Sequence, residues 1–283
     1  MVAYKNPKIP ETTQGKPKTS AQVGEAAKLS IYLVILVAVI GGLFYYAGAL
    51  IGGVVPFEWE EKLAMAEVFP LVEPHPPAAK AKEKALQKLA DRLAAGMDLD
   101  PEISITIHYR DQETVNAFAG FAGHIYVFEG LLEKLEYEEQ VAALLAHEIG
   151  HVKNRHIMKS FSANVFLTIA ITVASGESGA GDSLGQAVLT LESFTFTRNM
   201  EKEADEEALE ALKELYGNVG GFIALFEAFE GGPELKAGNY EFLLTHPYAS
   251  SRAERAEEFS VKEETLLTDP DLKWQVKSPG ENQ

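Results

Sequence analysis

The longest apolar stretch of the chain runs from Leu29 to Val55 and contains no charged residue. About 20 apolar residues are enough for a helix to cross the hydrocarbon core of a bilayer. A buried core helix of this length would rarely be so free of charge, so the pattern predicts a transmembrane anchor over residues 29–55. The preceding residues, 1–28, are polar and rich in lysine, and we expect them to form a flexible cytoplasmic tail.

Charges on the two sides of the apolar stretch predict its orientation. Lysines precede it, whereas Glu58, Glu60 and Glu61 follow it with only Lys62 opposing them. Because positive residues gather on the cytoplasmic side, we expect a single-pass membrane protein with a cytoplasmic N-terminus and with the bulk of the chain on the extracytoplasmic side. A cleaved signal peptide is the alternative, since residues 47–49 resemble a cleavage site, and it would yield a secreted or periplasmic protein.

Beyond the anchor, the hydrophobic pattern predicts mostly helices and one small sheet. Residues 66–80 are rich in proline and are expected to act as a stiff connector. Alternating isoleucines predict a strand over 103–109, and two short strands, 115–119 and 124–128, flank a glycine-containing turn as in a hairpin. Periodic apolar residues predict helices over 78–96, 131–135, 138–155, 161–174, 200–215, 222–229 and 247–259.

This order of elements predicts an α+β, mainly α fold, with one domain over 56–268 and a C-terminal tail over 269–283. Within the domain, residues 161–196 contain two apolar runs joined by a glycine- and serine-rich segment, which we interpret as a helical hairpin or lid. The first run has about 14 residues and is too short to span a bilayer comfortably. It would cover the functional site, dip into the membrane interface, or form ordinary buried helices.

Composition narrows the chemistry that is available to the chain. The 283 residues carry a formal net charge of −17 and include no cysteine. Nucleic-acid binding needs a basic face, so we expect no nucleic-acid partner. Without cysteine there is no disulfide, thiolate metal site or cysteine nucleophile, and any metal must be held by His, Asp or Glu.

The helix predicted over 138–155 contains the pattern H-E-x-x-H, with His147, Glu148 and His151 at the fixed positions. Residues four apart on a helix lie about 40° apart around its axis, so the two imidazoles can hold one zinc ion. Glu148 projects to the same side and could take a proton from a metal-bound water. His156 lies nine residues beyond His147, about 180° around the helix, and is therefore not expected to be a ligand.

Two histidines leave zinc short of ligands, because a catalytic zinc takes three protein groups and a water. The helix predicted over 200–215 offers Glu201 and Asp205, which share one face, whereas Glu203 points elsewhere. One of these two carboxylates can bind the metal. The other can accept a hydrogen bond from the far ring nitrogen of a ligand histidine.

Three motifs together resemble those of the membrane-associated zinc metallopeptidases related to HtpX, BepA and the CAAX prenyl endopeptidases. They are HEIGH at 147–151, TRNMEKEAD at 197–205, and THP at 245–247 followed by Arg252. Shorter stretches at 55–60, 116–119, 123–127 and 130–132 also look like that family, so the resemblance covers about residues 53–260.

The resemblance implies a zincin-like metallopeptidase domain with a small β-sheet beside the active-site helix. At the matching positions it makes His147, His151 and Glu201 the ligands of one zinc ion and Glu148 the general base. It also implies that Asp205 supports a ligand histidine.

Two further implications concern the substrate. The resemblance places His246 and Arg252 close to the metal or at the tetrahedral intermediate, and in some relatives the equivalent histidine can cap the metal. It makes the strand 124–128 the edge that binds substrate, through His124, Ile125, Tyr126 and Val127. The chain departs from HtpX and the prenyl endopeptidases in having one convincing transmembrane segment, and from BepA in showing no tetratricopeptide repeats.

Motif and resemblance together predict a membrane-anchored zinc endopeptidase that hydrolyses peptide bonds in protein quality control. Its partners would be unfolded or membrane-associated proteins and peptides, with lipid around residues 29–55. The alternative is a chaperone-like protein that holds such clients on the same fold without cleaving them. A third possibility, a membrane scaffold, would bind no stoichiometric zinc. The sequence assigns neither a natural substrate nor an oligomeric state.

Overall fold

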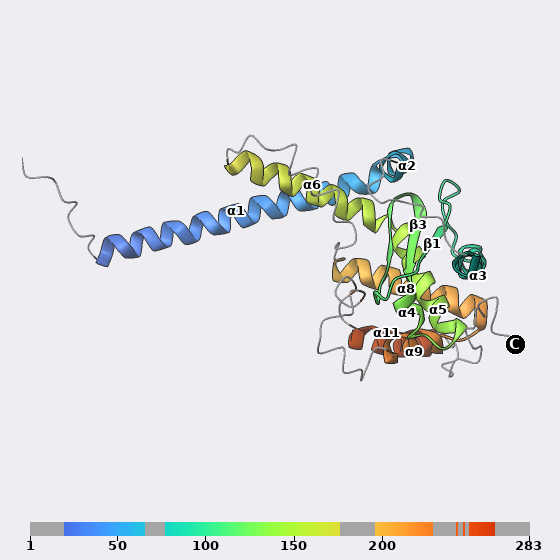
Figure 1. Cartoon of the computed structure of the whole chain (residues 1–283). Coiled ribbons are helices and arrows are strands. Elements are labelled where there is room, and N and C mark those ends of the chain that lie inside the picture. The colour runs from blue at the N-terminus through green and yellow to red at the C-terminus, as the bar shows by residue number, and fades with distance from the viewer. Residues whose placement is uncertain are drawn as a thin grey trace, which may run out of the picture. The chain divides into compact units, whose positions relative to one another are not determined.

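A computed structural model of the chain describes residues 20–65, 77–175, 196–228, 242, 246 and 249–263 (Figure 1). The chain divides into two units, residues 1–43 and 44–283. The described part of the first unit belongs to one helix, α1 (Ser20–Val54). The second unit contains the end of α1 and all the other described elements.

Helix α1 contains the predicted anchor. Its residues Ala27–Val54 form the one helix in the described part of the chain that is long and apolar enough to cross a membrane. The helix begins at Ser20, so the prediction of a flexible tail over 1–28 is wrong for residues 20–28. These residues read SAQVGEAAK, and alanine, glutamine, glutamate and lysine extend a helix readily.

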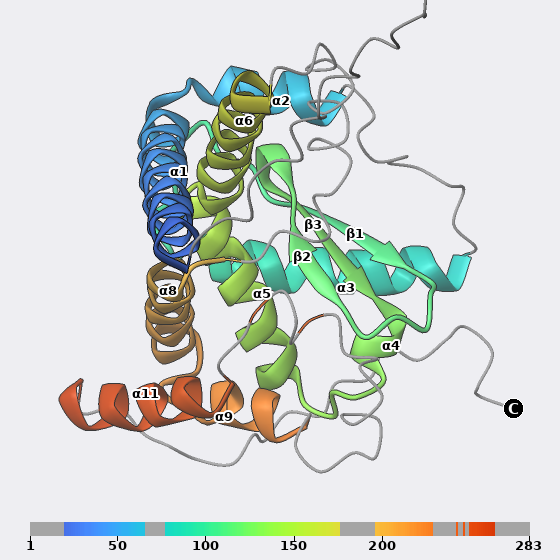
Figure 2. The ribbon, with the colours of Figure 1, turned by 90° about the vertical axis from the view of Figure 1, so that its left-hand side faces the viewer.

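Three strands form one mixed sheet in the second unit (Figure 2). Strands β2 (Ala117–Ala119) and β3 (His124–Phe128) pair antiparallel around the 3-10 turn η1 (Phe121–Gly123), which confirms the predicted hairpin. Strand β1 (Thr106–Arg110) pairs in parallel with the other side of β3, with Thr106 opposite His124. Strand β1 begins three residues later than the strand predicted over 103–109. The order of strands in the sheet is β1-β3-β2.

This order corrects the prediction that His124, Ile125, Tyr126 and Val127 form an edge strand. β3 is the middle strand, with β1 on one side and β2 on the other. Its main-chain groups already bond to these neighbours, so it cannot accept a peptide as an additional strand. Alternation of strand and turn indicates a hairpin in the sequence, but the parallel partner from 106–110 is a long-range contact that local pattern does not reveal.

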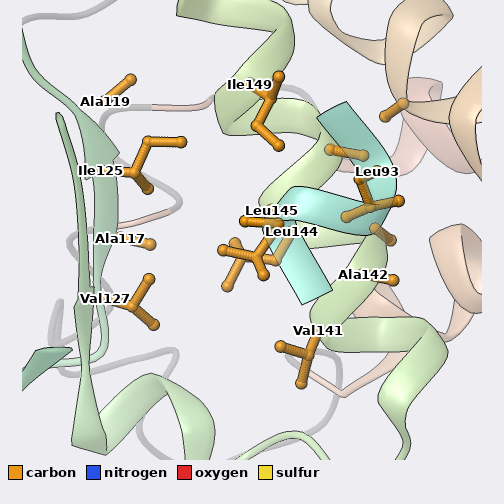
Figure 3. Close-up of a cluster of buried hydrophobic side chains, with 14 of the residues drawn as sticks. Leu93, Ala117, Ala119, Ile125, Val127, Val141, Ala142, Leu144, Leu145 and Ile149 are labelled. Carbon is orange, nitrogen blue, oxygen red and sulfur yellow. The ribbon is translucent and has the colours of Figure 1, made fainter. Parts of the chain in front are cut away.

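Helix α5 (Glu138–Lys153) carries the H-E-x-x-H pattern and lies at the centre of the second unit. Every residue from Glu139 to Val152 is buried, which an ordinary amphipathic surface helix would not allow. Figure 3 shows the sheet residues Ile125 and Val127 facing Leu144 and Leu145 of this helix. The remaining sides are covered by α3 (Pro77–Ala94), α8 (Arg198–Tyr216) and α9 (Gly220–Glu227). Burial on all sides fixes the direction in which the motif residues point.

The other helices are α2 (Phe57–Met65), α4 (Glu129–Leu132), α6 (His156–Ser175) and α11 (Ala249–Lys262). The last three overlap predicted helices but differ from them at their ends, whereas the sequence pattern predicts no helix over 57–65. The mainly helical α+β prediction is confirmed. The second arm of the predicted hairpin, 186–196, lies outside the described residues except for Phe196, as do connector residues 66–76 and the tail 269–283.

Helices α5 and α8 come close together at Gly150. A Cβ atom there would lie 3.0 Å from both the Cα and the carbonyl oxygen of Ala204 on α8. Backbone atoms cannot move aside as a flexible side chain can, so we expect Gly150→Ala to lower the free energy of unfolding by about 1–3 kcal/mol. Thermal unfolding of the full-length chain in detergent measures this. Gly42→Ala is the matched control, because a Cβ there meets nothing within 4 Å; equal losses in the two variants would contradict the close packing.

Candidate metal centre and active site

Four buried side chains bring one possible ligand atom each to a common point. The ligand atoms of His147, His151, Glu201 and His246 all lie within 4.8 Å of one another. His147 Nε2 is 3.0 Å from His151 Nε2 and 3.2 Å from His246 Nδ1. His246 Nδ1 is in turn 3.0 Å from Glu201 Oε1. Imidazole nitrogens and a carboxylate converging in this way are arranged as the ligands of one cation.

Helix geometry explains how three of these side chains reach the same point. His147 and His151 are one turn apart on α5, so they lie on the same side of it. Glu201 lies in the first turn of α8, whose N-terminus is capped by Thr197: its hydroxyl accepts a hydrogen bond from the Met200 N–H at 3.3 Å. A carboxylate in the first turn is also stabilised by the positive end of the helix dipole.

Glu148 lies beside this group and is completely buried. Neither of its carboxylate oxygens makes a hydrogen bond of normal geometry, and His246 Nε2 is 3.5 Å from Oε1. Burial raises the pKa of Glu148 to about 7, against smaller opposing effects that include those of His246 and the Ala119 backbone. A buried carboxyl group without a hydrogen-bond partner destabilises a fold, so such a group beside a set of possible metal ligands is a candidate catalytic residue.

The protonation states of His147, His151 and Glu201 fit a metal ion. Burial lowers the pKa of His147 to about 4 and that of His151 to about 3, so both imidazoles are neutral at neutral pH, as metal binding requires. Burial alone would raise the pKa of Glu201, but His246 and His151 together lower it, so this carboxyl group is ionised. Two neutral imidazoles and a carboxylate, all buried, are suited to a divalent cation.

Asp205 and Arg252 lie behind the ligand group. Asp205 Oδ1 is 3.1 Å from His147 Nδ1, the ring nitrogen that faces away from the other ligand atoms. Arg252 donates to the same oxygen from Nε at 2.9 Å and from Nη2 at 2.6 Å, and its Nη1 is 3.1 Å from Glu201 Oε2. Burial alone would raise the pKa of Asp205, but Arg252 and His147 together lower it. These contacts hold the His147 ring and the Glu201 carboxylate in place.

His156 contacts the site although helix periodicity places it on the far side of α5. The helix ends at Lys153, and Arg155 adopts a left-handed conformation with φ of 56° before α6 begins at His156. The prediction that His156 lies about 180° from His147 assumed one continuous helix, so it does not hold. The Nδ1 atoms of His156 and His151 lie 2.9 Å apart. Asn154, a residue type common at helix C-termini, is the signal that could have located this break.

Glu203 is a second residue that the sequence prediction placed away from the site. Its Oε2 is 3.0 Å from His156 Nε2, so it contacts the site through another residue. Of the predicted substrate strand, Ile125 and Val127 pack in the core against α5, while Tyr126 belongs to a separate cluster with Phe118 and Phe128. The strand residue that influences Glu148 is Ala119, at the end of β2.

A comparison with family profiles matches residues 80–260 to the family described as Peptidase family M48. Among curated proteins, the chain is similar to the beta-barrel assembly-enhancing protease of Escherichia coli O157:H7. The two are 29% identical over 153 residues, which cover 50% of this chain and 31% of that protein.

Two mitochondrial proteins are also similar to this chain. The mitochondrial metalloendopeptidase OMA1 of Schizosaccharomyces pombe is 27% identical over 164 residues, covering 56% of this chain and 49% of that protein. The mitochondrial metalloendopeptidase OMA1 of Bos taurus is 31% identical over 172 residues, covering 54% and 32%. The matches thus span about a third to a half of the length of these relatives. Because the family match covers more than half of the chain and includes the buried His and Glu group, the chain belongs to peptidase family M48, with a metallopeptidase domain.

Proposed function

We propose that this protein is a membrane-anchored, zinc-dependent endopeptidase. The observation that supports this most directly is the set of four ligand atoms within 4.8 Å beside Glu148, a buried carboxyl group without a normal hydrogen bond. A purely structural metal site needs ligands alone, whereas a hydrolytic site also needs a base next to the metal. The relatives are named protease and metalloendopeptidase, in agreement with this reading.

The residues of the site have two roles in the proposed reaction, metal binding and proton transfer. His147, His151 and Glu201 would hold a zinc ion, which when bound would lower the pKa of a water to about 7 and act as a Lewis acid on the scissile carbonyl. Glu148 accepts the proton of the attacking water and later delivers it to the leaving amine. Its complete burial keeps bulk water away from the proton during the transfer.

His246 reaches both the ligand group and the base. Its Nδ1 belongs to the ligand group, and its Nε2 is 3.5 Å from Glu148 Oε1. We assign it contact with the metal or with the charge that develops on the scissile carbonyl. The contacts of Arg252 with Asp205 and Glu201 favour a positioning role over direct contact with the reacting carbonyl.

An extended peptide substrate would lie along β2. Among the described strands, β2 pairs only with β3, and its last residue, Ala119, influences the pKa of Glu148 through its backbone. Main-chain hydrogen bonds to such an outer strand align a peptide regardless of most of its side chains. That mode of binding suits unfolded or membrane-associated proteins as substrates, and a role in protein quality control.

The anchor supports the location proposed for this activity. Large apolar side chains over residues 29–55 are exposed, including Leu36 at 55% and Leu50 at 76%. Lipid would cover them more favourably than water does. The lysine-rich side then faces the cytoplasm, which puts the peptidase domain on the other side of the membrane. Cleavage of the segment as a signal peptide would instead release this domain.

A second candidate function is the binding of unfolded proteins without cleavage. The fourth member of the ligand group, His246, favours it, because a metal with four protein ligands has no open position for a water. The outer strand β2 would hold a client by the same main-chain hydrogen bonds that would hold a substrate.

Metal analysis combined with a cleavage assay distinguishes these functions. We expect the full-length chain in detergent to contain one zinc ion per chain and to cleave casein, a largely unfolded protein. A chelator should stop the cleavage, and added zinc should restore it. Zinc-containing protein that binds casein without cleaving it would support the second candidate function. A chain without stoichiometric zinc would contradict both.

A further inference from the structure

The two histidines of the motif are supported from behind by different residues. His147 turns its Nδ1 towards the carboxylate of Asp205 at 3.1 Å. His151 turns its Nδ1 towards another histidine, His156, at 2.9 Å. The resemblance to known metallopeptidases accounts for Asp205 only. His156 and its neighbour Glu203 have no role in the function described so far.

The hydrogen bonds around His151 assign a direction to this contact. His151 presents Nε2 to the ligand group, 3.0 Å from His147 Nε2 and 3.5 Å from Glu201 Oε1. A neutral imidazole that binds a metal through Nε2 carries its proton on Nδ1 and must donate it. The acceptor in reach is His156 Nδ1.

The positions of the protons can be assigned in the same way for His156 and Glu203. If His156 accepts at Nδ1, its own proton is on Nε2. That nitrogen is 3.0 Å from Glu203 Oε2, which can only accept while it is ionised. His151 then donates a hydrogen bond to His156, and His156 donates one to Glu203. In neither contact do two N–H donors face each other.

We infer that His156 and Glu203 are positioning residues that hold His151 in the tautomer and orientation that binds zinc. The inference rests on the proposed function, because it takes His151 to be a zinc ligand. A histidine and a carboxylate here do for His151 what the Asp205 carboxylate, itself bonded to Arg252, does for His147. The structural difference is that Asp205 is buried, whereas the side chain of Glu203 is 51% exposed.

The surroundings hold His156 in this position. His156 is completely buried, and the Phe196 ring lies against His151 with ring centroids 4.0 Å apart. Arg155, which turns the chain between α5 and α6, donates to Glu60 Oε1 from Nε at 2.9 Å and from Nη2 at 2.6 Å. It also donates to the Val55 carbonyl oxygen. The turn that brings His156 back to His151 is therefore fixed by these partly buried contacts of Arg155.

Zinc affinity of the full-length chain in detergent, measured by competition with a chelator of known affinity, tests the inference. His156→Leu removes the acceptor and should weaken zinc binding by about 10- to 100-fold. His156→Asn places a side-chain oxygen near the position of Nδ1 and should restore most of that loss. Glu203→Ala, at a half-exposed position that should not affect folding, is expected to weaken binding by about tenfold.

Glu206→Ala is the matched control, because Glu206 is exposed on the same helix and pairs only with Lys202 among the described residues. It should keep the wild-type affinity. Cobalt in place of zinc adds a spectroscopic measurement: its visible absorption should change in His156→Leu and stay the same in Glu206→Ala. Unfolding temperatures of the zinc-free proteins show whether a variant has lost stability instead.

Three results would overturn the inference: wild-type affinity in His156→Leu, equal affinities in His156→Asn and His156→Leu, or equal affinities in Glu203→Ala and Glu206→Ala. If His156→Leu does not fold, the comparison of Glu203→Ala with Glu206→Ala decides. A wild-type chain that binds no zinc would overturn the proposed function, and this inference with it. Zinc binding that none of the variants changes would leave the proposed function standing and remove the positioning role.

Discussion

Replacement of Glu148 by glutamine should abolish peptide hydrolysis while leaving the metal bound. Glutamine has nearly the same shape, but its amide cannot accept the proton of the attacking water. Loss of a general base typically slows a reaction by about 10²- to 10⁴-fold. Glu148 is outside the group of four ligand atoms, so zinc content should not fall. The measurements are the initial rate of casein cleavage and the zinc content of the same full-length preparation.

The matched control for this variant is Glu210→Gln, which removes an exposed carboxylate on α8. It should cleave casein at the wild-type rate. A Glu148→Gln protein with wild-type activity would rule out the role of general base. A variant that loses its zinc together with its activity would place Glu148 in the ligand group instead.

Replacement of Arg252 by methionine should cause the largest loss of stability. The guanidinium group is completely buried and pairs with Asp205 and with Glu201, which are buried as well. Removing one partner of a buried ion pair leaves an uncompensated charge and typically costs about 3–5 kcal/mol. For a domain of this size that corresponds to a fall in the unfolding temperature on the order of 10 °C.

Arg255→Met is the control, because Arg255 bonds to the same carboxylate from a partly exposed position. Its Nη2 lies 2.5 Å from Asp205 Oδ2, with 27% of its side chain exposed. Water can replace most of this interaction, so we expect a loss of about 1 kcal/mol or less. Thermal unfolding of both full-length variants should be measured in detergent with excess chelator, so that changes in metal binding do not contribute. Equal losses would show that Arg252 does not hold a buried charge pair.

Local spacing was sufficient to predict which candidate ligands share a helix face, whereas the choice of Glu201 over Asp205 as a ligand came from the family resemblance. His147 and His151 are four residues apart, as are Glu201 and Asp205, and a helix brings such residues to one face whatever surrounds it. The structure places the ligand atoms of His147, His151 and Glu201 together and Asp205 behind His147. The hairpin of β2 and β3 was predictable for a similar reason, since its two strands adjoin a short turn with glycines.

Predictions that needed contacts between distant parts of the chain were less successful. The strand 124–128 was expected to be an edge strand, but β1, from earlier in the sequence, pairs with its free side. Helix periodicity places His156 far from the site, but Arg155, in a left-handed conformation, interrupts the helix. Glu60 and Val55, from the start of the domain, bind Arg155 in this conformation. Periodicity describes one element at a time, so it does not report where two elements meet.

The sequence by itself determined the helix that carries H-E-x-x-H, the residues that can hold a metal, and the apolar segment suited to a membrane. Each depends on the order of residues within about 30 positions of the chain, which local sterics and hydrophobicity govern. The tertiary structure alone decided that β2 and not β3 is an outer strand beside Glu148. It alone also brought His156 and Glu203 behind His151, because the burial that joins these segments is shared by residues far apart in the sequence.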